Sequence, residues 1–137
     1  MLSQTAEYAL RAVVFLAERG DPGPVRADEI GRALGIPANY LSKTLNTLVR
    51  ARVLASMRGR TGGFRLAVKP DQLALLRIVE PFDPIVQRRH CLLGKPDCSD
   101  RTACAAHAAW KTTSEKVVKF FRTTTVADIA ARRLGGS

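Results

Sequence analysis

Hydrophobic residues recur every three or four positions through the first third of the chain, a spacing that predicts amphipathic helices. The first such segment spans residues 3–19 and ends at a Gly-Asp-Pro-Gly-Pro stretch, residues 20–24, which cannot continue a helix. A second helix is expected from about Asp28 up to a cap at Gly35, and Pro37 suits the first turn of a third. Two helices joined by a tight glycine turn predict a helix-turn-helix.

The hydrophobic period then shortens to that of strands. Residues 53–57 and 64–68 are short strand-like runs on either side of Arg58-Gly59-Arg60-Thr61-Gly62-Gly63, which predicts a hairpin, or wing. A short helix is expected over residues 73–80, and residues 25–26 could form a further short strand. The fold class of this part is therefore mainly α with a small β-hairpin, a winged helix-turn-helix.

The C-terminal part returns to helical spacing after an irregular stretch. Within residues 105–122, five positions follow one another at intervals of 4, 3, 4 and 3, which is typical of a helix that buries a narrow seam against another helix. These positions are Ala106, Trp110, Thr113, Val117 and Phe120. Thr125 with Asp128 predicts a capping box for a last helix over residues 126–134. We expect a DNA-binding domain over 1–80, a cysteine-bearing loop over 81–104, and a dimerisation helix with a C-terminal helix over 105–137.

Length and composition narrow the function classes. The chain has 137 residues, 46% of them hydrophobic, which suits one folded domain and excludes a large multidomain enzyme. Its strongest hydrophobic run, residues 12–17, is too short to cross a bilayer, and no secretion leader precedes it, so we expect a cytoplasmic protein. We also expect no enzyme activity, because the sequence identifies no group that would orient a nucleophilic Cys–His pair.

The charge pattern points to double-stranded DNA as a partner. Of a net charge of +10, the segment 30–70 carries eight basic and no acidic residues. A helix fits the major groove and an arginine-tipped loop reaches phosphates, so a basic helix-turn-helix and wing favour DNA binding over a merely solvated basic face, and nucleotide binding lacks the P-loop context. The candidate DNA-binding residues are Ala38, Asn39, Tyr40, Ser42, Lys43, Asn46, Arg50, Arg58, Arg60 and Arg65.

The three cysteines form a candidate metal site. Cys91, Cys98 and Cys104 are followed by His107 in the spacing C-x6-C-x5-C-x2-H, and an odd cysteine count argues against a disulfide framework. Thiolate and imidazole donors suit zinc or an iron-sulfur cluster, and the spacing does not separate the two. The alternative is three small residues packed in a loop beside an ordinary helix histidine.

Several segments together carry a resemblance to a known family: TAEYALR at 5–11, NYL at 39–41, RGRTGGFRL at 58–66, CAAHAAW at 104–110 and TVADI at 125–129. The chain resembles the Rrf2 family of bacterial winged-helix transcription regulators, and its three cysteines are similar to those of the cluster-binding branch. The resemblance implies a homodimer whose long C-terminal helices pair, with each cysteine loop holding an iron-sulfur cluster close to the first helix of the partner chain.

The fourth cluster ligand has two candidates by resemblance. His107 would complete a 2Fe-2S site as in the iron-sulfur cluster regulators, whereas Glu7 of the partner chain would complete a 4Fe-4S site as in the nitric-oxide-sensitive repressors, and we favour Glu7. The expected function is a repressor or dual regulator that senses nitric oxide, redox or iron-sulfur status. The alternatives are a zinc-binding or thiol-redox regulator and a small electron-transfer protein, which would not explain the basic helix-turn-helix.

Overall fold

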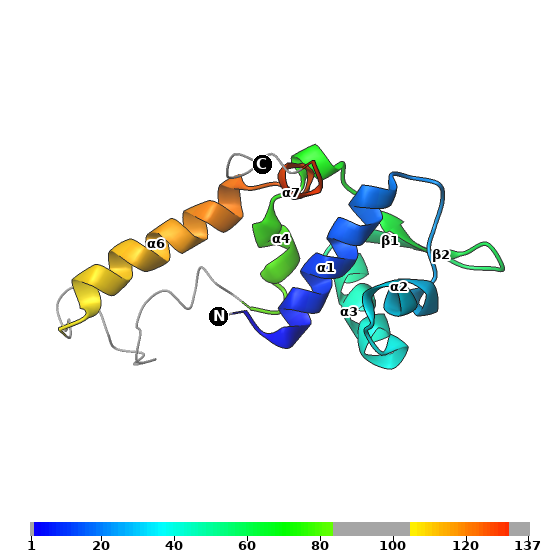
Figure 1. Cartoon of the computed structure of the whole chain (residues 1–137), viewed down its shortest axis with the longest axis horizontal. Coiled ribbons are helices and arrows are strands. Elements are labelled where there is room, and N and C mark those ends of the chain that lie inside the picture. The colour runs from blue at the N-terminus through cyan, green and yellow to red at the C-terminus, as the bar shows by residue number, and fades with distance from the viewer. Residues whose placement is uncertain (1, 84–104, 132–137) are drawn as a thin grey trace.

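Helices make up most of the molecule, and a two-stranded hairpin projects from one end (Figure 1). The computed structural model describes residues 2–83 and 105–131. In chain order the elements are α1 (Gln4–Arg19), α2 (Ala27–Leu34), α3 (Ala38–Arg50), β1 (Leu54–Met57), β2 (Gly63–Leu66), the 3-10 helix η1 (Pro70–Gln72), α4 (Leu75–Val79), α6 (His107–Thr123) and α7 (Val126–Ala130). This arrangement confirms the predicted fold class of a mainly α winged helix-turn-helix.

Helix α1 is the centre of the packing. It contacts α2, α3, α4, α7 and β2, and its alanines let these elements approach closely. The Ser3 hydroxyl caps its first turn by accepting a hydrogen bond from the Ala6 N–H at 3.2 Å, as the residue type favours. The inward face of α1 is fully buried at Ala6, Ala9, Ala12 and Val13. A helix buried in this way positions α2, α3 and β2, which carry or adjoin the candidate DNA-binding residues.

The helix-turn-helix is held by a close approach of α2 to the start of α3. Gly35 adopts the left-handed conformation (φ 68°, ψ 32°) that ends α2, as predicted. Gly31 lies so near the turn that a Cβ there would come within 2.6 Å of the Ile36 carbonyl oxygen. From α1, the Arg11 guanidinium donates to the Leu34 carbonyl oxygen at 2.6 Å. The angle between α2 and α3 is therefore set by backbone contacts as well as by side-chain packing.

The wing is a short antiparallel hairpin with Leu54 opposite Leu66 and Met57 opposite Gly63. Its strands are shorter than the predicted runs 53–57 and 64–68. The strand considered at residues 25–26 is a single bridge, in which the Val25 N–H donates to the Phe64 carbonyl oxygen at 2.9 Å. This bridge attaches the segment before α2 to the root of the wing.

The predicted helix over 73–80 forms only in part, because a long-range backbone pairing uses its first residues. The Leu75 N–H donates to the Thr124 carbonyl oxygen, and the Val126 N–H donates to the Leu73 carbonyl oxygen, each at 2.9 Å. Ala74, bridged to Thr125, keeps an extended backbone, and α4 starts at Leu75, whose N–H is free to pair outward because the first N–H groups of a helix have no intrahelical partner. The Thr125–Asp128 capping box forms as predicted, and α7 ends at Ala130. The rest of the predicted last helix, from residue 132, lies outside the described residues.

Helix α6 runs away from the body toward the end opposite the wing (Figure 1). It packs on α4 and buries Ser114, Val118 and Phe121. The predicted seam lies on other faces of the same helix, where Thr113 is exposed and Phe120 is 48% exposed. No helix among the described residues is long and apolar enough to cross a membrane.

Candidate nucleic-acid interface and metal-ligating residues

The side of α3 that carries most of the predicted DNA-binding residues faces solvent. Leu41, Leu45 and Leu48 are fully buried against the core, which leaves the opposite side of the helix outward. That side exposes Asn39, Lys43, Asn46 and Arg50, together with Ala38 and Tyr40, and Tyr40 is 64% exposed. Ser42 differs from the others in being half-buried.

Three hydrogen bonds tie polar side chains of α3 to the helix itself. The Thr44 hydroxyl donates to the Tyr40 carbonyl oxygen at 3.2 Å, and the Thr47 hydroxyl donates to the Lys43 carbonyl oxygen at 3.1 Å. The Arg50 guanidinium donates to the Thr47 hydroxyl at 3.2 Å, which orients it along the helix. Among the described residues, no such bond occupies the side-chain donors of Asn39, Lys43 and Asn46, which leaves them available for a nucleic acid.

Arg58 and Arg60 occupy the tip of the wing and are exposed. Within the part of the chain that the structure describes, neither forms an ion pair with a carboxylate. The turn beneath them is compact, because a Cβ on Gly62 would lie 2.2 Å from the Met57 carbonyl oxygen. The wing therefore presents two unneutralised guanidinium groups on a short rigid hairpin, a form that suits phosphate contacts.

Arg65 differs from the other two wing arginines. The sequence places no acidic residue near it, yet the fold brings Asp21 from the loop after α1 into an ion pair and hydrogen bond with its guanidinium. Arg65 is also half-buried, at the edge of a cavity of about 360 Å³ beside the end of α1. Its charge is thus partly neutralised within the chain, which distinguishes it from Arg58 and Arg60.

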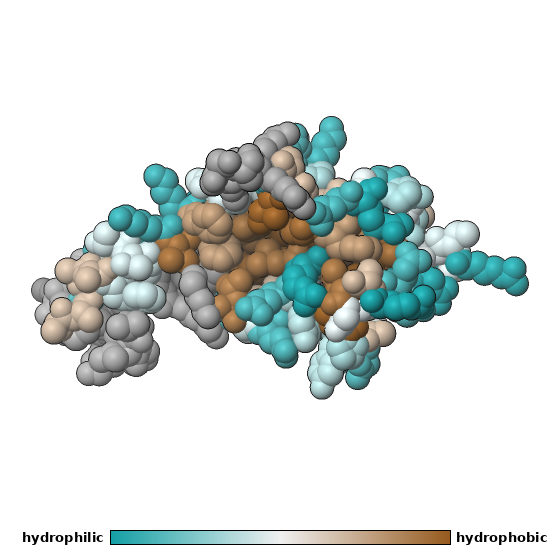
Figure 2. All heavy atoms as spheres, viewed as in Figure 1, coloured by the Kyte–Doolittle hydropathy of each residue, from teal (hydrophilic) through white to brown (hydrophobic). Residues whose placement is uncertain are grey.

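The predicted DNA-binding residues did not include Arg26, at the N-cap of α2, or Arg32, in its last turn. Two acidic residues, Asp28 and Glu29, lie between them in the sequence. In the structure Arg26 lines a shallow hollow of about 220 Å³ together with Met57 and the wing glycines. Figure 2 shows hydrophilic side chains covering the end of the molecule that carries α2 and the wing, while hydrophobic side chains gather over its middle.

The predicted metal ligands are only partly in view. Cys91, Cys98 and Cys104 lie outside the described residues, and within residues 2–83 and 105–131 no group of three or more His, Cys, Asp or Glu side chains is placed to hold a metal ion. His107 begins α6 and is half-buried. Glu7 is exposed on the first turns of α1, and in the described structure Arg11 bonds to Leu34 rather than pairing with it.

Glu7 borders a groove between the start of α1 and the outer part of α6. The groove has a volume of about 550 Å³ and is lined by Leu2, Glu7, Thr113, Lys116, Val117, Phe120 and Phe121. Thr113 comes six residues after His107, which corresponds to about 9 Å along a helix axis. The groove beside Glu7 therefore lies at a different level of α6 from His107, so the two candidate ligands occupy separate places in one chain.

Comparison with known proteins identifies the family. A sequence profile of the Rrf2 family, described as "Iron-dependent Transcriptional regulator", matches residues 2–132. The chain belongs to the Rrf2 family. Among Rrf2 relatives, the HTH-type transcriptional regulator IscR of Aliivibrio salmonicida is 33% identical over 119 residues, which cover 87% of this chain and 70% of that protein. An HTH-type regulator of Aquifex aeolicus is 33% identical over 131 residues, covering 94% and 90%.

Solved structures give the same architecture. CymR, the global cysteine regulator of B. subtilis, superposes with a TM-score of 0.82 at 22% identity, covering 96% of this chain and 97% of that one. The IscR of T. potens superposes with a TM-score of 0.77 at 21% identity, covering 97% and 88%. This Rrf2 protein is accordingly a DNA-binding transcription regulator and not an enzyme.

Proposed function

We propose that this Rrf2 protein is a repressor that binds operator DNA as a homodimer and senses nitric oxide, redox or iron-sulfur status through an iron-sulfur cluster. The observation that carries the proposal is the donor set, three cysteines close in sequence followed by His107, in a chain 33% identical to an IscR. Thiolates are the usual ligands of iron-sulfur clusters, and a fourth oxygen or nitrogen donor fits a more easily exchanged position. The residues present therefore suit the group.

The proposed ligands are Cys91, Cys98 and Cys104, with Glu7 of the partner chain or His107 as the fourth. When bound, the cluster would supply the redox and ligand-exchange chemistry that reports the signal. Glu7 is well placed to pass a change onward, because Arg11 follows it by one helical turn and holds the end of α2 through the Leu34 carbonyl oxygen. A shift of α1 would in this way change the orientation of the helix-turn-helix.

The dimer proposal is supported by the two-sided character of α6. Its Phe121 packs on the chain's own core, while Phe120 is exposed and lines the open groove next to Glu7. Apolar side chains on a helix that leads away from the body favour pairing with a second copy of that helix. Such pairing would place two recognition helices on one face, as a palindromic operator requires.

Anaerobic reconstitution with iron and sulfide tests the cluster and its ligands. We expect visible absorption with stoichiometric iron and sulfide in the wild type, and loss of both when all three cysteines are changed to Ala. Glu7→Ala should make the cluster more labile, whereas Glu18→Ala, an exposed carboxylate at the other end of α1, should leave it unchanged. If only His107→Ala perturbs the spectrum, His107 is the fourth ligand and the Glu7 assignment is wrong.

A second candidate function is direct sensing by the thiols or by bound zinc. The same three cysteines carry it, because thiolates bind zinc and oxidise as readily as they hold iron. A colourless reconstituted protein whose DNA binding still responds to oxidation would favour this second function over the cluster.

A further inference from the structure

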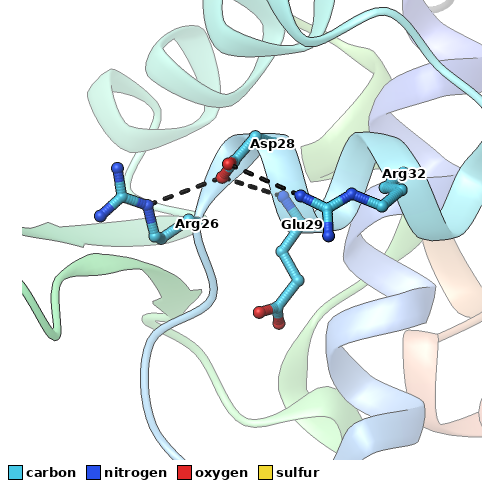
Figure 3. Close-up of polar contacts among 4 residues, drawn as sticks. All are labelled: Arg26, Asp28, Glu29 and Arg32. Atoms are coloured by element: carbon cyan, nitrogen blue, oxygen red, sulfur yellow. Dashed lines mark hydrogen bonds and ion pairs between the residues drawn. The ribbon is translucent and has the colours of Figure 1, made fainter.

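Three charged residues along α2, from its N-cap to its last turn, form a cluster that the described interface does not use. The Asp28 carboxylate lies between two guanidinium groups, with the Arg26 Nε at 3.6 Å from Oδ1 and an Arg32 Nη at 3.8 Å from Oδ2. Oδ1 also accepts a hydrogen bond from the Glu29 N–H at 3.0 Å. Figure 3 shows Arg26 and Arg32 on opposite sides of Asp28, with the Glu29 side chain pointing away from all three.

The position of Arg26 is fixed by the root of the wing. Val25, the residue before it, is bridged to Phe64 through two backbone hydrogen bonds. The chain passes so close to Gly63 that a Cβ there would lie 2.8 Å from the Arg26 nitrogen. The Arg26 side chain therefore leaves the backbone at a rigid point beside the wing, in the hollow that Gly59 and Gly62 also line.

The position of Arg32 is fixed by the helix-turn-helix. It directly follows Gly31, whose backbone abuts the turn leading into α3. Arg26 and Arg32 thus stand toward the two ends of α2, with Asp28 between them, Arg26 beside the wing and Arg32 beside the turn that leads into the recognition helix. DNA phosphates follow such surfaces on either side of a helix that enters the major groove.

The two ion pairs are loose. The side chains of Arg26, Asp28 and Arg32 are 64%, 57% and 78% exposed, and both nitrogen-to-oxygen distances exceed hydrogen-bond length. Exposed pairs of this kind add little to stability, so either arginine can exchange its partner at small cost. Asp28 itself is held more firmly, because its oxygen is bonded to the helix backbone.

We infer that Asp28 is an internal substitute for a DNA phosphate, and that Arg26 and Arg32 move from its carboxylate to the DNA backbone when the protein binds. Asp28 then sets how strongly the protein holds DNA of any sequence, because it competes with phosphate for the same two guanidinium groups. The inference rests on the DNA-binding function and adds these three residues to the interface.

The inference can be tested by measuring, with fluorescence anisotropy across a KCl series, how the protein binds a mixed-sequence duplex of about 25 base pairs. An operator sequence is not needed, because phosphate contacts do not depend on the base sequence. Arg26→Gln should make the negative slope of log K against log salt shallower by about 0.9 and weaken binding about fivefold near 0.15 M salt. Arg77→Gln, an exposed arginine on α4, is the matched control and should do neither. Asp28→Asn, which keeps an oxygen for the Glu29 N–H, should tighten binding about threefold or more.

Two comparisons separate partner exchange from a simple change in net charge. Glu29→Gln removes a neighbouring carboxylate that pairs with Arg19 instead, at 3.8 Å, and should tighten binding less than Asp28→Asn. When Arg26→Gln and Arg32→Gln are both present, the gain in DNA affinity from Asp28→Asn should fall to the size of the gain from Glu29→Gln.

The inference is overturned if Asp28→Asn and Glu29→Gln act equally in the wild-type background, or if Arg26→Gln behaves like Arg77→Gln. In either case binding that still depends on Arg60 leaves the DNA-binding function standing. Absence of any duplex binding by the wild type would overturn that function together with this inference. Thermal unfolding of each variant, expected to match the wild type because the side chains are exposed, separates these outcomes from misfolding.

Discussion

Val25 and Phe64 exchange backbone hydrogen bonds in both directions, at 2.9 and 2.8 Å, although they are far apart in sequence. This pair joins the segment that precedes α2 to the second strand of the wing. The wing is therefore tied to the helix-turn-helix by direct backbone contacts. Such a connection can present α3 and the arginine-tipped hairpin to DNA in a fixed relation.

Gly63 permits this junction, so its substitution should loosen the wing. Its φ of +145° is costly for other residues, and an added Cβ would lie 2.5 Å from the Val25 carbonyl carbon and oxygen. We expect Gly63→Ala to lower the free energy of unfolding by about 2 kcal/mol. Gly59→Ala, with positive φ but open space around it, should cost about 1 kcal/mol. Urea denaturation measures both, and equal losses would argue against the close junction.

Arg60 should contribute more to DNA affinity than Arg65. Arg60 is exposed and unpaired among the described residues, whereas Arg65 is paired with Asp21. Arg60→Ala should make the negative slope of log K against log salt shallower by about 0.9, which corresponds to one lost phosphate contact. Arg65→Ala should change the slope by clearly less. Anisotropy titrations with KCl provide the measurement. Unchanged affinity and slope in Arg58→Ala/Arg60→Ala would refute the assignment of the wing to DNA.

Asn39 and Lys43 should determine sequence preference rather than overall affinity. Both are exposed on the first turns of α3, the part of a recognition helix that reaches base edges. Asn39→Ala or Lys43→Ala should change the ranking of selected DNA sequences, with discrimination at the contacted base pair falling by about 1 to 3 kcal/mol. Selection from a random duplex pool gives the ranking. Uniform weakening, as expected for Arg58→Ala, would identify these residues as phosphate contacts instead.

Phe120 should stabilise the dimer. It is 48% exposed and meets Phe121 edge-on, with ring centroids 5.5 Å apart. Phe120→Asp should shift sedimentation at micromolar concentration from dimer to monomer and abolish cooperative binding to two half-sites one helical turn apart. Lys119→Asp places the same charged group on the preceding residue, which is also exposed, and should leave the dimer intact. A wild-type monomer that binds DNA normally would contradict the dimer proposal.

The parts of the fold that sequence predicted well are those decided by neighbours in the chain. The end of α2 at Gly35 follows from the left-handed conformation that glycine tolerates, and the capping box at Thr125 follows from side chains three residues apart. The outward face of α3 follows from the spacing of its leucines. The cysteine ligands were predicted on the same local grounds, and they remain a prediction because they lie outside the described residues.

The sequence by itself determined the order of helices and hairpin, the basic character of the segment 30–70 and the donor chemistry of the cysteines, because composition and periodicity act over one or two turns of chain. Only the tertiary structure decided that residues 73–75 pair with 124–126 instead of extending a helix, that Asp21 neutralises Arg65, and that Arg26 stands at the wing root. These features depend on which distant segments meet. These segments come together because the faces of α1 are buried against several elements at once. The spacing of residues within one segment does not indicate which distant segment it will contact.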